Sequence, residues 1–193
     1  AITEAAKNYP EQQFALIDAV CEGEQPENVT SLLFEDNASA YLTGLIAGRM
    51  TETNKVGFIG GMESPVISKF DYGFRAGVKA ANPDAEVMVQ YANSFTDSAL
   101  GKTIANQMHS KNADIIFTCA GAVGIGAIEA AKENGKKAIG VDQDQNALAP
   151  ENVITSAMKN IDVAVVELLS KVVDGSYKGG EVIINTLAMN GVG

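Results

Sequence analysis

Short apolar runs alternate with longer segments of helical period through the middle of the chain. Four runs have the length of a strand, namely VGFIGG (56–61), EVMVQY (86–91), DIIFTC (114–119) and AIGV (138–141). Each run is followed by a helix start signal or by an amphipathic stretch. This alternation is typical of a parallel sheet that is covered by helices.

The expected helices between these runs have recognisable start and stop signals. Ser64 followed by Pro65 predicts an N-cap with proline at the first helical position. Asp97 can cap a second helix, and a third opens at Gly124 and stops at Asn134-Gly135. The inward faces predicted for the three helices consist of Val66, Phe70, Phe74 and Val78, of Leu100, Ile104 and Met108, and of Ile125, Ile128 and Ala131.

The segments on either side of this block also have the patterns of helices and short strands. Before it we expect a helix over about 1–8, apolar runs at 14–20 and 29–34, and a helix with Leu42, Leu45, Ile46 and Met50. After it we expect an apolar run at 153–158, a helix with Ile161, Val165, Leu168 and Val172 that stops at Gly175, and a final strand, EVIIN. The pattern therefore predicts an α/β protein whose flanking pieces need a partner sheet.

Composition narrows the classes of function. The chain has 193 residues, of which 46% are apolar, enough to bury a sizeable core. Its formal charge of −10, from 14 Lys and Arg against 24 Asp and Glu, argues against nucleic acid and against a large phosphate-bearing partner. A small neutral ligand suits this balance better. No apolar run reaches the ~18 residues of a membrane span, and AITEAAKNYP lacks the regions of a signal peptide.

Both ends of the chain are abrupt, since it opens on a helix-like segment without a methionine and stops at NGVG. We therefore expect a fragment that is truncated at both ends. Cys21 and Cys119 lie far apart without a pairing motif. Buried free thiols are favoured here over a disulfide or a reactive cysteine.

The stretch KKAIGVDQDQNALAP, residues 136–150, gathers acids and amides after an apolar run. Asp142, Asp144 and Asn146 match positions 1, 3 and 5 of a calcium loop, but Ala147 and Val153 occupy positions 6 and 12, which require glycine and glutamate. Calcium is excluded on this pattern. A catalytic carboxylate pair is disfavoured too, because residues two apart at a strand end point to opposite faces.

Asp142 lies at the expected carboxyl end of a parallel strand, where open α/β sheets bind ligands. A carboxylate there accepts two hydrogen bonds, such as the vicinal hydroxyls of a sugar offer. A helix cap or a solvated loop acid explains the residue equally well at this point.

Other strand ends carry further candidates. Gly121 begins a glycine-rich turn that lets a ligand approach the backbone, although its G-x-x-G-x-G spacing departs from a dinucleotide fingerprint. Phe95 can stack on a planar base or cover the core, and Lys159 can donate to ligand hydroxyls or be solvated. Met62 follows another strand-to-helix turn, beside Glu63, in a setting unsuited to phosphate.

Evidence for an enzyme is weak in this sequence. His109, the sole histidine, lies near a helix end, where solvation or C-terminal capping is favoured over catalysis. The motifs G-x-S-x-G, H-E-x-x-H, C-x-x-C and the Walker sequence are missing. A nucleoside-cleaving hydrolase or a dehydrogenase would need an activated water or a hydride carrier, for which no ligand cluster or intact fingerprint is present.

Several motifs in order resemble one family over nearly the whole chain. They are KVGFIGGMESPVISKFDYGFRAG, NSFTD, AGAVGIGAIEAAKENGKKAIGVDQDQ and PENVITSAMKN. Together they resemble the basic membrane lipoprotein family, whose best-known type is the purine nucleoside receptor of bacterial ABC importers.

The resemblance implies a type I periplasmic-binding-protein-like α/β fold. In that fold two lobes, each a Rossmann-like parallel sheet with helices on both faces, are joined by three crossovers around a ligand cleft. Residues 37–154 would form one lobe, 1–36 a remnant of the N-terminal lobe and 155–193 a return segment to it. The family pattern further implies that Phe95 stacks on the purine, Gly121 makes a backbone contact, Asp142 and Lys159 hydrogen-bond the ribose, and Met62 lines the cleft.

The expected function is that of an extracytoplasmic receptor with a purine nucleoside as ligand, an ABC permease as partner and no cofactor. Membrane contact would run only through a lipid anchor that this chain lacks, since Cys21 and Cys119 are both internal. Two alternatives within the same fold stay open: an intracellular sensor or transcription-regulator domain, and a receptor for another small polar ligand such as a sugar or a signal molecule.

Overall fold

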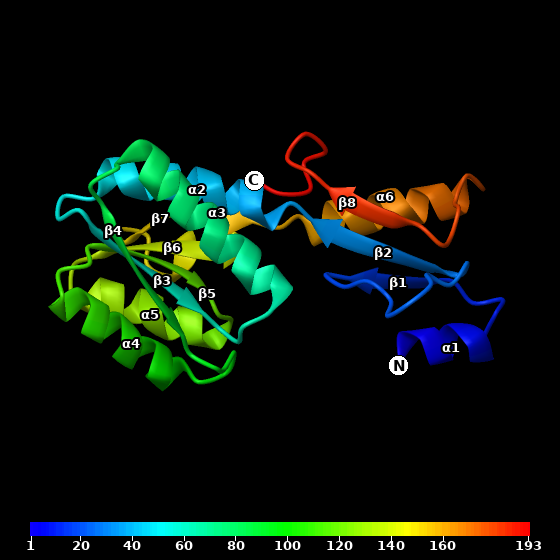
Figure 1. Cartoon of the computed structure of the whole chain (residues 1–193), viewed down its shortest axis with the longest axis horizontal. Helices are drawn as coiled ribbons and strands as arrows, with labels where there is room; N and C mark the ends of the chain where they lie inside the picture. The colour runs from blue at the N-terminus through cyan, green and yellow to red at the C-terminus, as the bar shows by residue number, and fades with distance from the viewer. The chain divides into compact units, whose positions relative to one another are not determined.

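The computed structural model describes residues 1–193 and divides them into two compact units (Figure 1). The smaller unit consists of residues 1–35 and 160–192, and the larger unit of residues 36–159 with Gly193. No helix in either unit has the length and apolar character of a membrane span. The larger unit continues through Lys159, beyond the boundary at 154 that the sequence suggested.

The larger unit is built around one parallel sheet of five strands in the order β4-β3-β5-β6-β7. Its elements follow the alternation read from the sequence. They are α2 (Asp36–Met50), β3 (Lys55–Gly60), α3 (Pro65–Ala81), β4 (Glu86–Tyr91), α4 (Ser98–Ser110), β5 (Ile115–Cys119), α5 (Ala122–Glu133), β6 (Lys137–Asp142), the short 3₁₀ helix η1 (Asn146–Leu148) and β7 (Val153–Met158). The last strand lies outside the block in which the sheet was expected, yet it pairs in parallel with β6.

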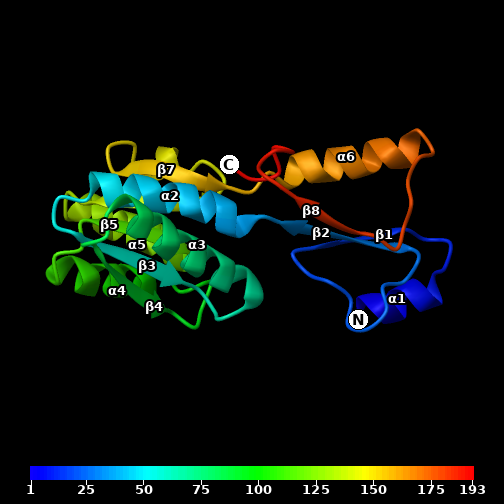
Figure 2. The same ribbon diagram turned by 45° about the horizontal axis from the view of Figure 1, so that its top comes forward.

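Helices cover both faces of this sheet. Figures 1 and 2 show α2 and α3 on one face and α4 and α5 on the other. The chain runs from β3 outward to β4 and then returns past β3 to β5, so the strand order reverses at β3 and β5. Open α/β sheets bind their ligands outside the carboxyl ends of the strands at such a reversal.

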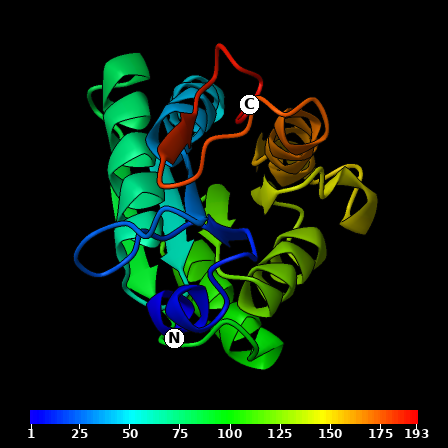
Figure 3. The same cartoon turned by 90° about the vertical axis from the view of Figure 1, so that its right-hand side faces the viewer.

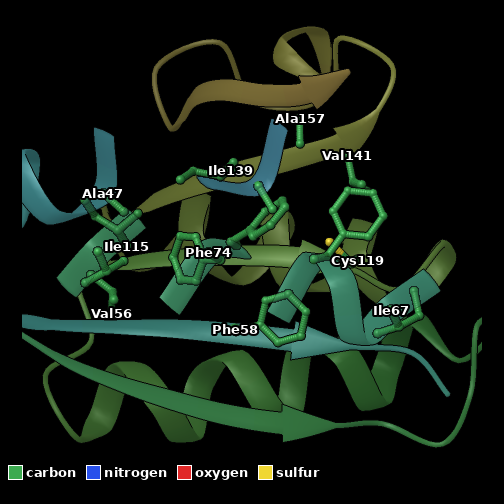
Figure 4. Packing of buried hydrophobic residues seen from close by; sticks show 14 residues of the cluster. Ala47, Val56, Phe58, Ile67, Phe74, Ile115, Cys119, Ile139, Val141 and Ala157 are labelled. Atoms are coloured by element: carbon green, nitrogen blue, oxygen red, sulfur yellow. The ribbon is translucent and has the colours of Figure 1, made fainter. Parts of the chain in front are cut away.

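A group of phenylalanine rings fills the core between the sheet and the α2–α3 layer, as Figure 4 shows. Phe117 on β5 contacts Phe58 on β3 and Phe74 on α3, with ring centroids 5.7 and 5.1 Å apart. All three rings are fully buried. Tilted and edge-on contacts of this kind stabilise a core beyond the area that they bury.

The smaller unit has a parallel sheet of three strands in the order β1-β2-β8. Its elements are α1 (Ile2–Asn8), β1 (Phe14–Ile17), β2 (Val29–Phe34), α6 (Ile161–Val173) and β8 (Val182–Asn185). Leu32 and Phe34 pack against α6, whereas Val29 packs against α1. The two helices therefore lie on opposite faces of the small sheet, and α6 is the orange helix in Figure 3.

The buried face of two helices differs from the expected one. Helix α5 begins at Ala122 rather than at Gly124, and Ile125 is 46% exposed, although Ile128 and Ala131 are buried as predicted. Small residues line the inner faces of α5, so it approaches its neighbours closely and Ile125 is left on the outer face. Leu42 on α2 is exposed for the same reason: the buried side of α2 is made of small and polar residues that pack on α3.

We expect the aromatic core to dominate the stability of the larger unit. Phe117→Ala removes a fully buried ring, and the free energy of unfolding should fall by about 3–5 kcal/mol. Tyr72→Ala is the control, because Tyr72 is 65% exposed and should change stability by only about 0.5 kcal/mol. Urea unfolding followed by circular dichroism measures both, and equal losses would contradict this account of the core.

Candidate functional site

Five residues singled out in the sequence lie at one edge of the five-stranded sheet. Each follows, or in one case ends, a different strand, and neighbouring parallel strands end at the same edge. In order across the sheet from β4 to β7 they are Phe95, Met62, Gly121, Asp142 and Lys159. Met62 is 49% exposed at the end of β3. The structure thus brings all five to the edge that includes the reversal of strand order.

Two glycines set the position of the aromatic ring. The ring of Phe95 lies over Gly61, where an added Cβ would come within 2.1 Å of the ring carbon Cε1. The Phe95 carbonyl accepts a hydrogen bond of 2.8 Å from the Ala122 amide and lies against Gly121, which has a φ of +57°. A side chain at either glycine would collide with Phe95. Phe95 remains 39% exposed, so one side of the ring is open rather than sealed into the core.

Asp142 ends β6 with a left-handed backbone, at a φ of 67°. Such a conformation is uncommon outside glycine, although aspartate tolerates it better than most residues. The Asp142 carbonyl accepts a hydrogen bond of 2.9 Å from the amide of Lys159, which joins the ends of β6 and β7. The side chain of Asp142 is exposed at this edge.

The other polar residues of the loop after β6 shape the loop itself. Asp144 accepts a hydrogen bond of 2.9 Å from the Asn146 amide, and Asn146 donates to the carbonyl of Val153. Gln145 accepts from the amide of Val141 at 3.0 Å. These contacts account for the cluster of acids and amides in the sequence and distinguish Asp144 from Asp142.

Lys159 is buried instead of solvated. Its side chain is only 4% exposed, and its ammonium Nζ lies 3.0 Å from Oδ1 of Asp36, whose side chain is 1% exposed. The same Nζ lies 5.4 Å from the centroid of the Phe70 ring. Sequence reasoning missed Asp36, because an acid in the first turn of a helix is ordinarily explained by the helix dipole.

A second buried acid lies under the end of β4. Asp71 on α3 accepts hydrogen bonds from Nη2 of Arg75 at 3.3 Å and from the Tyr91 hydroxyl at 3.1 Å, and its Oδ1 lies 2.8 Å from Nε of Arg75 in an ion pair. Burial, followed by the charge of Asp71, raises the pKa of Tyr91 to about 12. The sequence does not reveal the Tyr91–Asp71 contact, because these two residues are 20 positions apart and only the fold joins them.

The two cysteine thiols and the histidine are all buried. Cys119 and Cys21 are both free and buried, as predicted, and burial raises the pKa of the Cys119 thiol well above its ordinary value. His109 is 8% exposed, so of the two expected environments, solvation and C-terminal capping, it does not have the first. Its Nδ1 lies 2.9 Å from the Ala113 carbonyl just beyond α4, and burial lowers its pKa. No group of three His, Cys, Asp or Glu side chains is placed to hold a metal ion.

Comparison with known proteins shows the family to which the chain belongs. The model of the Bmp family, described as ABC transporter substrate-binding protein PnrA-like, matches residues 1–193. The chain belongs to the Bmp family. The resemblance to basic membrane lipoproteins is thereby confirmed, and the family is one of substrate-binding proteins rather than enzymes.

Individual Bmp relatives support the same assignment. The chain is 41% identical over 209 residues to the ABC transporter nucleoside-binding protein BmpA of Lactococcus lactis subsp. cremoris, and the match covers 100% of this chain but 59% of that protein. Among solved structures, a solute-binding protein of an ABC transporter system from Aeropyrum pernix K1 superposes with a TM-score of 0.90 at 33% identity, over 98% of this chain and 55% of that one.

A transcriptional activator of the comK gene from Bacillus halodurans has a TM-score of 0.88 at 26% identity, over 100% of this chain and 65% of that one. These likenesses confirm the expected type I periplasmic-binding-protein-like fold. The chain spans little more than half the length of the Lactococcus relative.

The Tyr91–Asp71 contact in this Bmp chain predicts a loss of stability at alkaline pH. The folded state holds the Tyr91 proton more tightly than the unfolded state, so this stabilisation is complete below pH 10 and is lost as the pH rises towards 12. The free energy of unfolding should therefore fall more steeply over this range in the unaltered protein than in Tyr91→Phe. Tyr72→Phe, which removes an exposed hydroxyl, is the control. Identical profiles for Tyr91→Phe and the unaltered protein would contradict the prediction.

Proposed function

We propose that this chain is part of an extracytoplasmic substrate-binding lipoprotein of an ABC importer, and that it binds a purine nucleoside at the carboxyl edge of the larger unit's sheet. The observation that carries the proposal is the order of side chains along that edge. A half-exposed ring, Phe95, lies at one end, and Asp142 and Lys159 lie together at the other. The printed name of the Lactococcus relative, a nucleoside-binding protein, agrees with it.

This arrangement suits both halves of a nucleoside, the base and the ribose. Its base is flat and stacks on an aromatic face, for which the open side of Phe95 is available. Its ribose presents vicinal hydroxyls, which donate to a carboxylate such as Asp142 and accept from an ammonium such as Lys159. Because the ring lies over Gly61 at the end of β3, it is two strand spacings, or about 10 Å, from β6.

The charge of the chain supports a neutral ligand. The formal net charge is −10, and Asp142 adds a carboxylate at the site itself, so a phosphate would meet repulsion. Gly121 completes the proposed site by letting a ligand approach the backbone between the base and ribose ends, and Met62 lines it beside the ring. The family description supports a permease as the partner of the whole protein and an extracytoplasmic, lipid-anchored location.

The likeness to the comK activator favours one alternative, an intracellular regulator that uses this fold as a sensor. The natural sequence upstream of residue 1 separates the two proposals. A signal sequence that ends in a lipid-modified cysteine supports transport, whereas a DNA-binding helical module supports regulation.

Removal of the stacking ring should weaken binding of the base. In the protein at its natural full length, Phe95→Ala should lower the affinity for inosine, guanosine or adenosine by roughly 10- to 100-fold, because stacking on an aromatic side chain contributes about 1–3 kcal/mol. Tyr72→Ala removes another exposed aromatic side chain of the same unit and should leave the affinity unchanged. Isothermal titration measures both, and a failure of the unaltered protein to bind any of the three nucleosides would refute the proposal.

Loss of the carboxylate at the end of β6 should weaken recognition of the ribose alone. Asp142→Asn should reduce the affinity for inosine by about tenfold, since a hydrogen bond to a charged group contributes about 1.5–3 kcal/mol. The same change should have little effect on 2′,3′-dideoxyinosine, which lacks both hydroxyls. A loss of similar size for both ligands would show that Asp142 acts elsewhere. Asp144→Asn, in the same loop, is the matched control.

A further inference from the structure

The loop that carries Phe95, residues 92–97, joins β4 to α4 and is bonded at its start to the end of β3. The amide of Ala92 donates to the carbonyl of Gly60 at 2.8 Å, and the amide of Asn93 donates to the carbonyl of Gly61 at 2.9 Å. Gly61 is the residue over which the Phe95 ring lies. The first part of the loop is therefore held by the same strand end that the ring covers.

The far side of Phe95 is held by α4 and α5. Asp97 caps α4 by accepting a hydrogen bond of 2.9 Å from the Leu100 amide. The start of α4 crosses α5 closely, because an added Cβ at Gly126 would come within 1.9 Å of the Ser98 carbonyl oxygen. The Phe95 carbonyl is itself bonded to the first amide of α5. The chain is therefore fixed on both sides of the short segment that includes the ring.

Ser94 closes this segment. Its hydroxyl oxygen accepts hydrogen bonds from the amides of Thr96 and Asp97, each 3.2 Å long. Serine hydroxyls shape turns in this way, by bonding to the backbone two or three residues further along. Because the acceptor precedes Phe95 and both donors follow it, the backbone cannot open at Phe95 without loss of both bonds.

The orientation of the ring matters for the strength of binding. A loop or side chain that becomes ordered only when the ligand arrives reduces the affinity, whereas a support that is present beforehand removes this cost. Phe95 is 39% exposed, so packing alone leaves part of the ring without a support. The turn at Ser94 supplies such a support through the backbone.

We propose that Ser94 is a positioning residue for recognition of the base. It fixes the backbone on both sides of Phe95 and so keeps the ring over Gly61, in the orientation that stacks on a base, before the ligand arrives. This role rests on the proposed nucleoside function and deepens it, because it assigns part of the affinity to a residue that acts through Phe95. Two explanations compete with it: the Ser94 hydroxyl bonds to the ligand directly, or the turn serves the fold alone.

A double-mutant cycle with Phe95 separates these explanations, and isothermal titration of inosine into the protein at its natural full length measures it. Ser94→Ala should lower the affinity by roughly threefold to tenfold, the cost of ordering a side chain on binding. In the Phe95→Ala background the same change should alter the affinity by less than about twofold, because no ring remains to be oriented. Equal losses in both backgrounds would show a direct contact with the ligand, and no loss in either would show a role in the fold alone. Either outcome would overturn the proposal.

Two further variants test the hydroxyl itself. Ser94→Thr keeps a hydroxyl at this position and should retain the affinity of the unaltered protein, so a loss as large as that of Ser94→Ala would contradict the role. Thr53→Val is the matched control, because Thr53 accepts from the Lys55 amide at 3.3 Å in the loop before β3, at the opposite edge of the sheet. It should leave the affinity unchanged, and a loss equal to that of Ser94→Ala would count against a specific effect at Ser94.

Hydrogen exchange in the ligand-free protein tests whether the support precedes binding. The Ala122 amide donates to the Phe95 carbonyl rather than to Ser94, so its exchange rate reports on the backbone at the ring. Exchange should be faster in Ser94→Ala than in the unaltered protein and slow again in Ser94→Thr. Equal rates in all three would show that the ring position does not depend on Ser94. Absence of inosine binding by the unaltered protein would instead refute the nucleoside function itself, and this role with it.

Discussion

All five strands of the larger unit run in the same direction, and every candidate binding residue depends on that direction. A parallel sheet places the carboxyl ends of its strands at one edge, so residues that are far apart in sequence come into a single row there. Phe95 and Lys159 are 64 positions apart in the sequence, and the strand order alone assigns them to opposite ends of this row. One antiparallel strand would move its residue to the far edge.

The strands that end at this edge pack closely against the helices that cover them. Phe58 and Phe117 lie in β3 and β5, the two strands at which the order reverses, and their rings contact each other in the core. Side chains that recognise a ligand need supports that do not move when the ligand arrives. The aromatic core therefore supports the ends of β3 and β5, and with them the turns that carry candidate binding residues.

Much of this architecture could be predicted from the alternation of apolar runs and amphipathic stretches, since strands of a buried parallel sheet are short, apolar and regularly spaced. The ends of those strands identified Asp142 and Phe95 as candidates. Periodicity failed where small residues let elements approach closely, as at Ile125, whose outward position depends on its neighbours rather than on its own hydrophobicity. It also failed for Asp36, because the partner of a buried charge is a property of tertiary structure.

The position of the Phe95 ring over Gly61 matters when related chains are compared. Gly61 contributes no side chain, yet its lack of a Cβ is what leaves room for Phe95. A related chain with a bulkier residue at this position would retain the sheet and the core but would have to place its aromatic side chain elsewhere. The residue at position 61 therefore separates relatives that can place an aromatic ring here from relatives that cannot.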